Sequence, residues 1–351
     1  MKDNEHIKIK EYFAAANTYR GFKSYFDSVF RSEDFNRVYV LKGGPGTGKS
    51  SFMKKASSVL SEKGCNIEKI YCSSDPRSLD GIIAEKSDRK IAILDGTAPH
   101  ERDAKIPGAI DELINLGVGW ERNWLSARKK EILDLTKEKS YAYKTAYTYL
   151  SIAGKSHDYI LSIHAAGFKK TKAKSKAEEF LKDINTSSGR IDTRLISSFG
   201  RYGKTRLDTL SRLSENRYSV GGDEFAASLF LSMCNDILRD KSIGFTHFPQ
   251  ALDQSATDAI FIPEAALIVD RDADGKINAD EFVNISAIDS ERIKKARQLL
   301  RDSLDEAQRW FAIASDLHFR LEEIYGQAMN FDVIDGIFDS TITEINNILE
   351  K

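Results

Sequence analysis

The hydrophobic pattern around residue 40 changes from that of a strand to that of a helix. Residues 37–42 (RVYVLK) form a short β-branched run that is typical of a buried strand. After the glycine-rich residues 43–50, apolar side chains recur at helical spacing at Phe52, Met53, Ala56, Val59 and Leu60. Gly64 follows as a helix stop. This stretch therefore predicts a strand, a glycine-rich loop and a helix.

Two further apolar runs predict additional strands. Residues 67–72 (IEKIYC) form one, and residues 91–95 (IAILD) form another that ends in an acid. Because strands and helices alternate along this part of the chain, we expect an α/β fold. Its sheet should be parallel, with the helices as crossover connections.

The pattern changes to a long, charged and helical one between residues 111 and 182. It predicts two or three helices, with a break near residues 153–154. Residues 168–176 carry five lysines, which is typical of a solvated helix face. Residues 185–189 (NTSSG) have the composition of a linker.

Four blocks of the first half recur in the second half in the same order. They pair residues 37–44 with 217–222, 79–83 with 257–261, 92–95 with 267–270, and 146–157 with 307–318. The offsets are 178, 178, 175 and 161 residues, and they change only between blocks, as deletions in a second copy would require. We therefore predict a tandem duplication of one α/β unit, each copy followed by a helical arm. The alternative is that the second half is an unrelated helical domain.

The length of 351 residues predicts two or three domains. The duplication divides the chain into four segments. We predict a P-loop NTPase domain over 1–120, a helical arm over 121–188, a degenerate P-loop-like domain over 189–287 and a C-terminal helical arm over 288–351.

Composition and charge exclude several classes of protein and of binding partner. Lys and Arg total 52 against 53 Asp and Glu, so the chain lacks the overall positive charge that nucleic acids or acidic membranes attract. The 41% of hydrophobic residues and only 6 Pro exclude a disordered or collagen-like chain. Three cysteines fit a reducing compartment. The charged first residues predict no signal peptide, and no apolar run is long enough to cross a membrane. We expect a cytoplasmic protein with neither a membrane nor a nucleic-acid partner.

Residues 43–50 (GGPGTGKS) match the spacing G-x-x-x-x-G-K-[ST] of a phosphate-binding loop. Glycines permit positive φ and let backbone N–H groups face a phosphate, and the next helix presents its positive N-terminus. Lys49 supplies a charge for the β- and γ-phosphates, and the Ser50 hydroxyl is placed to ligate Mg²⁺. The predicted ligands of ATP are Gly43, Gly44, Pro45, Gly46, Thr47, Gly48, Lys49, Ser50 and Ser51.

Asp95 is the predicted second Mg²⁺ ligand and a catalytic residue beside Lys49, because it ends an apolar strand. The next residue is Gly96, whereas many ATP hydrolases carry there a Glu that polarises water. Glu101 is the predicted substitute. The alternatives are His100, Asp103 and residues 73–75. No guanine-reading N/T-K-x-D pattern follows the third predicted strand, which favours ATP over GTP.

The segments GGPGTGKSS (43–51), CSSDPRSLDG (72–81) and AILDGTAPHERDAKIPGAIDELINLG (92–117) resemble those of a bacterial family of duplicated P-loop ATPases. The resemblance is close over residues 7–120 and faint over 190–351. It implies a nucleotide-binding ATPase built from two P-loop halves. It also implies residues 43–51 as the phosphate loop and Asp95 as the Mg²⁺ acid, and it names no substrate.

The second half departs from the loop pattern. Aligning Gly43 with Gly221 places Asp223 and Glu224 at the positions of Pro45 and Gly46, and Ala226 and Ala227 at those of Gly48 and Lys49. Losing the lysine and gaining two acids would repel a triphosphate. We therefore predict that the second unit does not bind nucleotide in the ordinary way.

Residues 270–281 match the 12-residue EF-hand loop, with acids at positions 1, 3 and 5, Gly at 6 and Glu at 12. The predicted Ca²⁺ ligands are Asp270, Asp272, Asp274, the backbone carbonyl of Lys276, and Glu281. However, the preceding run aligns with a strand rather than an entering helix, and EF-hands usually work in pairs. This context favours an acidic surface turn.

Three functions fit these observations. The first is a Mg²⁺-dependent ATPase whose second half acts as a degenerate copy and supplies an arginine to the first site. The candidates for that arginine are Arg201, Arg206, Arg212 and Arg217. The second is a small-molecule kinase. The third is an ATP-gated switch with negligible turnover, whose Tyr-rich helical arms engage a protein partner.

Overall fold

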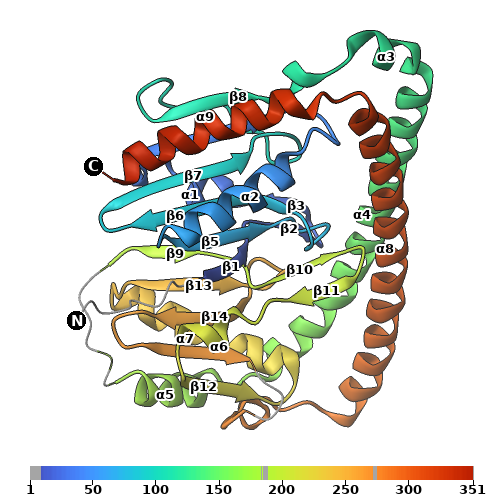
Figure 1. Ribbon diagram of the computed structural model, residues 1–351. Coiled ribbons are helices and arrows are strands. Elements are labelled where there is room, and N and C mark those ends of the chain that lie inside the picture. The colour runs from blue at the N-terminus through green and yellow to red at the C-terminus, as the bar shows by residue number, and fades with distance from the viewer. Residues whose placement is uncertain (1–8, 183, 185–188, 272–274, 351) are drawn as a thin grey trace.

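The computed structural model describes residues 9–182, 184, 189–271 and 275–350, and two six-stranded sheets organise it (Figure 1). The first sheet has the order β1 (Ile9–Phe13), β5 (Asn66–Tyr71), β6 (Leu79–Lys86), β7 (Arg89–Asp95), β4 (Arg37–Lys42) and β8 (Asp111–Asn115). The second has the order β9 (Ile191–Thr193), β13 (Phe245–Pro249), β14 (Thr257–Ile262), β15 (Leu267–Arg271), β12 (Asn216–Gly221) and β16 (Ile277–Asn278).

The two sheets share one topology, strand for strand. In each, the third strand of the order runs antiparallel to both neighbours, and the other pairs are parallel. The expected all-parallel sheets are therefore wrong, because β6 and β14 follow their predecessors as antiparallel neighbours. The pairing slips at the same place in both sheets, between Ile70 and Tyr71 and between Phe248 and Pro249. The chain thus contains two similar α/β units, and the second half is not an unrelated helical domain.

Each unit also has a short β-hairpin, and a helix that follows β4 in the first unit and β12 in the second. The helices are α2 (Lys49–Glu62) and α7 (Glu224–Asp240). The hairpins are β2 (Ala15–Thr18) with β3 (Gly21–Ser24), and β10 (Ser197–Gly200) with β11 (Gly203–Arg206). The shorter helices are α1 (Phe26–Val29), η1 (Ser32–Asp34), η2 (Leu116–Gly119), α3 (Arg122–Ala127), α6 (Thr209–Leu213) and η3 (Ala279–Phe282). As predicted, Phe52, Met53, Ala56 and Leu60 of α2 are buried in the core.

The two units meet around an approximate two-fold axis. Phe13 and Leu195, which directly precede the hairpin of their own unit, exchange two backbone hydrogen bonds of 2.8 and 3.0 Å. Such a mutual exchange is what an isologous contact between equivalent residues produces.

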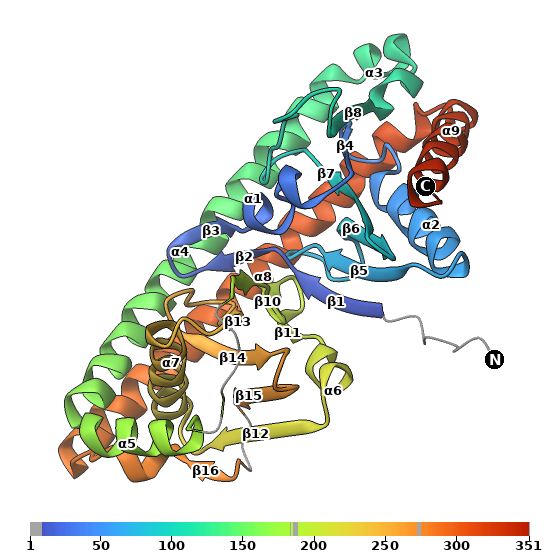
Figure 2. The same cartoon turned by 90° about the vertical axis from the view of Figure 1, so that its left-hand side faces the viewer.

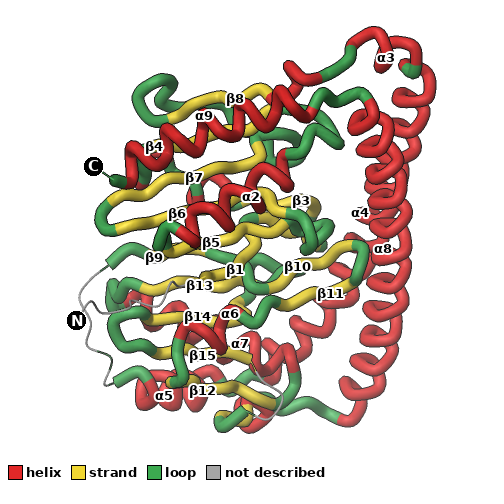
Figure 3. The backbone as a smooth tube through the Cα atoms, in the orientation of Figure 1, coloured by secondary structure: helices red, strands yellow, loops and turns green. Residues whose placement is uncertain are grey.

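Two long helices, α4 (Lys129–Gly167) and α8 (Ala287–Gln327), lie side by side and antiparallel (Figures 1 and 2). The tube view shows them along one side of the stacked strands (Figure 3). The predicted break near residues 153–154 is wrong, because α4 runs through Gly154 without interruption. A β-carbon at Gly154 would lie 2.6 Å from that of Tyr19, so this glycine permits a close approach rather than a break. None of the described helices has the length and apolar character that a membrane span requires.

The helices that follow this pair are exchanged between the units. Helix α9 (Phe331–Leu349) comes last in the chain but packs with α2 over the first sheet, and α5 (Lys170–Phe180) packs with α7 on the second. The buried residues of α9 are Ile334, Phe338, Thr341, Ile342, Ile345 and Leu349. The last predicted segment, 288–351, therefore contributes a helix to the core of the first unit.

Candidate functional site

The glycine-rich loop of residues 43–48 connects the carboxyl end of β4 to the start of α2. Gly46 and Gly48 have φ values of 68° and 87°, which glycine adopts readily. Gly48 is the N-cap of α2 and offers no side chain to the first N–H groups of the helix. Those groups, together with the helix dipole, form the kind of N-terminus that binds anions.

Lys49 spans this loop. Its Nζ donates hydrogen bonds of 2.9 Å to the carbonyl oxygens of both Gly43 and Gly44, and Thr47 Oγ1 donates to Gly44 at 2.9 Å. Lys49 Nζ also lies 3.7 Å from Asp95 Oδ2. Both side chains are largely buried, so little solvent screens their attraction.

Asp95 ends β7 directly beside β4, where it faces Leu41 in the parallel register. Asp95 Oδ1 accepts hydrogen bonds from the backbone N–H and the hydroxyl of Thr97, at 2.8 and 2.6 Å, which fixes the carboxylate. Ser50 Oγ accepts from the N–H of Leu79 at 3.0 Å. The described residues contain no cluster of three or more His, Cys, Asp or Glu that could hold a metal alone. Mg²⁺ bound together with a nucleotide needs fewer protein ligands, and the donors of Ser50 and Asp95 suit it.

The buried side chain of Arg102 connects the loop after Asp95 to the neighbouring residues of the first unit. Arg102 donates to the carbonyl of Phe30 and to Ser32 Oγ, and Asp111 lies 3.4 Å from its guanidinium. Of the predicted water-orienting residues in this loop, Asp103 pairs with Lys42 Nζ at 2.6 Å. Glu101 is exposed and has no polar partner among the described residues, so its catalytic role stays a prediction.

His100, another of these candidates, belongs to a buried pair that the sequence did not reveal. Its Nε2 lies 3.3 Å from Asp80 Oδ2, and its ring stacks on Phe26 with centroids 4.1 Å apart. Burial disfavours a charged imidazole, but the carboxylates of Asp80 and, more weakly, Asp95 raise the pKa of His100. The sequence contained one indication that Asp80 is important, because the repeat aligns it with Asp258 of the second unit. Both aspartates are buried in the structure.

Residues from α8 and α9, near the end of the chain, pack against the glycine-rich loop. A β-carbon at Gly46 would clash with the carbonyl oxygen of Glu322 in α8. A β-carbon at Gly44 would lie 3.2 Å from Trp120, and one at Gly48 would lie 3.6 Å from Phe331 at the start of α9. No periodicity or spacing in the sequence predicts that these residues meet.

The four candidate arginines have different surroundings. The backbone N–H of Arg201 donates to the carbonyl of Ser74 at 3.4 Å, so it borders the predicted 73–75 loop of the first unit. Arg206 and Arg217 pair with the buried acids Asp258 and Asp270 of their own unit. The fourth, Arg212, pairs with Glu11 of β1. Arg201 thus borders the 73–75 loop through its backbone, whereas its guanidinium pairs with Asp316 of α8 at 3.1 Å.

In the second unit, residues 222–223 alone connect β12 to α7, so a carboxylate takes the N-cap position that Gly48 has in α2. The predicted alignment of Asp223 with Pro45 is therefore wrong, because the connection is shorter in the second unit. Asp223 is the N-cap of α7, and its Oδ1 accepts from the N–H of Phe225 at 2.9 Å. His164 Nε2 lies 3.0 Å from Asp223 Oδ1, and Arg297 pairs with the other oxygen. Although burial alone would raise it, the hydrogen bond from His164 and the charge of Arg297 lower the pKa of Asp223 to about 2. This helix start is therefore capped and charge-neutralised by the protein itself.

The EF-hand-like segment lies partly outside the described residues, because Asp272 and Asp274 are not described. Asp270 is buried at the end of β15 and pairs with Arg217, and Glu281 lies 3.6 Å from Lys172. The element before the segment is a strand, not the entering helix of an EF-hand. Calcium binding stays a prediction.

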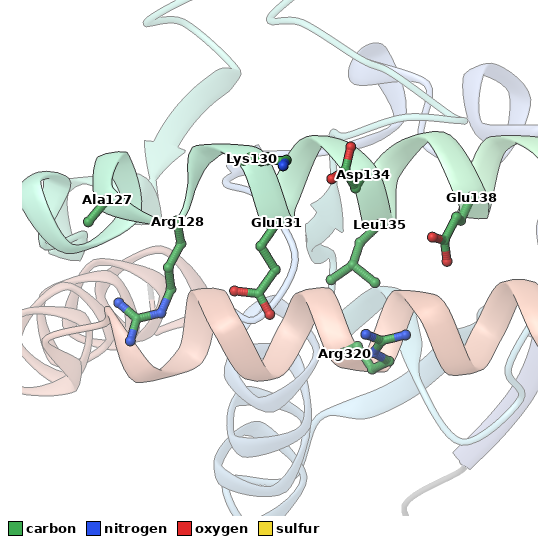
Figure 4. A pocket seen from close by; sticks show the side chains of 8 residues that line it. All are labelled: Ala127, Arg128, Lys130, Glu131, Asp134, Leu135, Glu138 and Arg320. Atoms are coloured by element: carbon green, nitrogen blue, oxygen red, sulfur yellow. The ribbon is translucent and has the colours of Figure 1, made fainter.

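Two of the hollows on the described surface lie near the ends of the long helices. One, of about 610 Å³, lies beside the glycine-rich loop between residues 118–121 and 327–333. The other, of about 460 Å³, lies between α4 and α8 (Figure 4). Its described lining balances three acids against three bases, which suits a solvated groove between helices. The acids are Glu131, Asp134 and Glu138, and the bases are Arg128, Lys130 and Arg320.

Comparison with known proteins found no family model, no curated protein and no solved structure that matches this chain.

Proposed function

We propose that the protein binds ATP at residues 43–51 and hydrolyses it with Mg²⁺, and that the second unit is a copy without this activity. The observation that carries the proposal is the position of Lys49. Its ammonium group lies between two loop carbonyls and 3.7 Å from Asp95, at the start of a helix with no capping side chain. These are the parts that phosphoryl transfer uses for positioning and charge stabilisation.

The residues divide this task. The N–H groups of the loop and of the start of α2 would hold the phosphates, and Lys49 would exchange its carbonyl partners for phosphate oxygens. Ser50 and Asp95 would hold Mg²⁺, which neutralises phosphate charge when bound. Glu101 is the predicted water-orienting residue, and His100, whose imidazole Asp80 would hold in place, is an alternative in the same loop.

The test is phosphate release from Mg-ATP, with nucleotide binding measured in parallel. Removing one charge-stabilising group from such a site lowers the rate roughly 100-fold or more, so Lys49→Ala should abolish most of the release. Lys54→Ala is the matched control, because Lys54 is exposed on the same helix and loses the same charge. Equal release from wild type and Lys49→Ala, or no ATP binding by wild type, would contradict the proposal.

A second candidate function is an ATP-gated switch. It is favoured by the packing of Gly46 against Glu322, which joins the loop directly to the end of α8. A nucleotide that shifts the loop would then shift α8 and its neighbour α4, on which a protein partner could dock. Hydrogen exchange with and without ATP tests this function, and unchanged protection of α8 would exclude it. Phosphate transfer to an added metabolite, with no release to water, would instead indicate the kinase.

A further inference from the structure

The hollow beside the glycine-rich loop lies on the opposite side of the loop from Asp95. Strand β4 lies between β7, which ends in Asp95, and β8, which leads into η2. Residues of η2 and of the turn from α8 into α9 line this hollow. If the terminal phosphates and Mg²⁺ lie toward Asp95, as the proposed function requires, the nucleoside end of the nucleotide points toward the hollow.

The lining suits an uncharged aromatic ring better than a phosphate. Three large apolar side chains stay open to solvent there: Val118 is 56% exposed, Phe331 48% and Val333 40%. The described lining has two carboxylates, Glu121 and Asp332, and no Lys, Arg or His. An anion would be repelled, whereas a purine could stack on the ring and donate its amino hydrogens to a carboxylate.

The second unit provides an internal comparison. The N–H of Asn330 donates to Gly119 at 2.8 Å, and the N–H of Lys169 donates to Phe282 at 2.7 Å, so these pairs are equivalent. Glu281, the residue before Phe282, is therefore equivalent to Val118, the residue before Gly119. In the same way Lys170, the residue after Lys169, is equivalent to Phe331, the residue after Asn330. Lys172 takes the place of Val333 and lies 3.6 Å from Glu281. The surface is therefore apolar beside the open loop and charged beside the capped one.

We propose that the hollow binds the purine base of the nucleotide held by residues 43–51, with Phe331 as its stacking partner. This inference rests on the proposed function. Phe331 is well placed for the role, because its ring lies against the end of the loop near Gly48 and its helix is anchored on the first sheet. Base stacking on an aromatic side chain depends on the ring and not on the phosphates.

The experiment is calorimetric titration of two probes, Mg-ATP and magnesium tripolyphosphate, into wild type and variants. Phe331→Ala should weaken ATP binding about tenfold and leave tripolyphosphate binding unchanged, and Phe331→Tyr should restore ATP binding. Lys170→Ala, at the equivalent position of the second unit, is the control and should change neither affinity. Lys49→Ala should weaken both.

The outcomes separate the two proposals. Equal ATP affinity in wild type and Phe331→Ala, or equal losses of ATP and tripolyphosphate affinity, would overturn the base site while the phosphate site stands. Binding of neither probe by wild type would overturn the proposed function itself. Since Phe331 is half exposed, the variant should retain its fold, and an unchanged unfolding temperature checks this.

Discussion

The two units have the same sheet order and the same register slip, yet the starts of their equivalent helices differ. In the first unit, α2 begins after Gly48 with no capping side chain and with Lys49 across the loop. In the second, α7 is capped by Asp223, which His164 and Arg297 neutralise. The same fold can thus leave the N–H groups at a helix start available to an external anion, or pair them with a carboxylate of the protein itself.

The exchanged helices differ in a similar way. The hydrogen bonds that make Asn330 equivalent to Lys169 also make Phe338 equivalent to Ala177 and Ile334 equivalent to Ala173. All four of these core side chains are buried. The first unit therefore depends on large side chains from the far end of the chain, whereas α5 packs small ones against the second.

The largest expected effect is on this dependence. Phe338 packs edge-on against Phe52, with ring centroids 5.0 Å apart. Phe338→Ala should therefore lower the free energy of unfolding of the first unit by roughly 3–5 kcal/mol, because it leaves a cavity in the core. Urea unfolding followed by tryptophan fluorescence measures the change. Asp339→Ala, one exposed residue further on the same helix, should stay within about 0.5 kcal/mol. Similar values for both variants would show that α9 is not part of that core.

The next effect concerns the contact between the loop and α8. Gly46→Ala should cost roughly 1–2 kcal/mol for its left-handed backbone, and a further 1–3 kcal/mol because the new methyl group clashes with Glu322. Gly48→Ala is the control, since it has the same kind of φ but only an ordinary contact with Phe331. Thermal unfolding compares the two variants. A cost for Gly48→Ala as large as that for Gly46→Ala would mean that the contact with α8 is unimportant.

The smallest effect is the pH dependence of the capped site. The pKa of Asp223 is lowered from 3.8 to about 2, so its stabilisation is present above pH 3.8 and lost as the pH falls toward 2. Despite its burial, His164 has a raised pKa because it bonds to Asp223. Its contribution is present below pH 6.5 and lost as the pH rises through the folded value.

Asp223→Asn should therefore lower the free energy of unfolding by about 2 kcal/mol between about pH 4 and 6.5. The loss should be smaller at a pH above the raised pKa of His164, where the imidazole is neutral. Urea unfolding of wild type and variant across this range measures both values. A cost that does not vary with pH would indicate that His164 carries no charge in this pair.

The sequence predicted the local elements and the duplication better than the assembly. The strand over 37–42, the helix after it and the repeat of the whole unit are confirmed, because hydrophobic periodicity and block order are local signals. The antiparallel direction of β6 was not predicted, because an apolar run such as residues 79–83 does not specify in which direction a strand pairs with its neighbours. The exchange of α9 was missed because the apolar face of a helix does not specify which sheet it covers.

The candidate site divides in the same way. The proximity of Lys49 and Asp95 follows from a loop and an acid at the ends of two strands, which the topology makes adjacent. Trp120, Glu322 and Phe331 reach the loop only through tertiary packing between distant segments, so no spacing could predict them. The same is true of the carboxylate cap in the second unit, where the sequence predicted repulsion but not the partners His164 and Arg297.

The exchange of α5 and α9 has a consequence for how the chain could be divided. Neither half of the polypeptide contains a complete unit, because α5 of the first half packs in the second unit and α9 of the second half packs in the first. The molecule has the organisation of a domain-swapped dimer whose two subunits are covalently joined. Two separately expressed halves should consequently fold only as a complex, and the single chain replaces that concentration-dependent association with an intramolecular one.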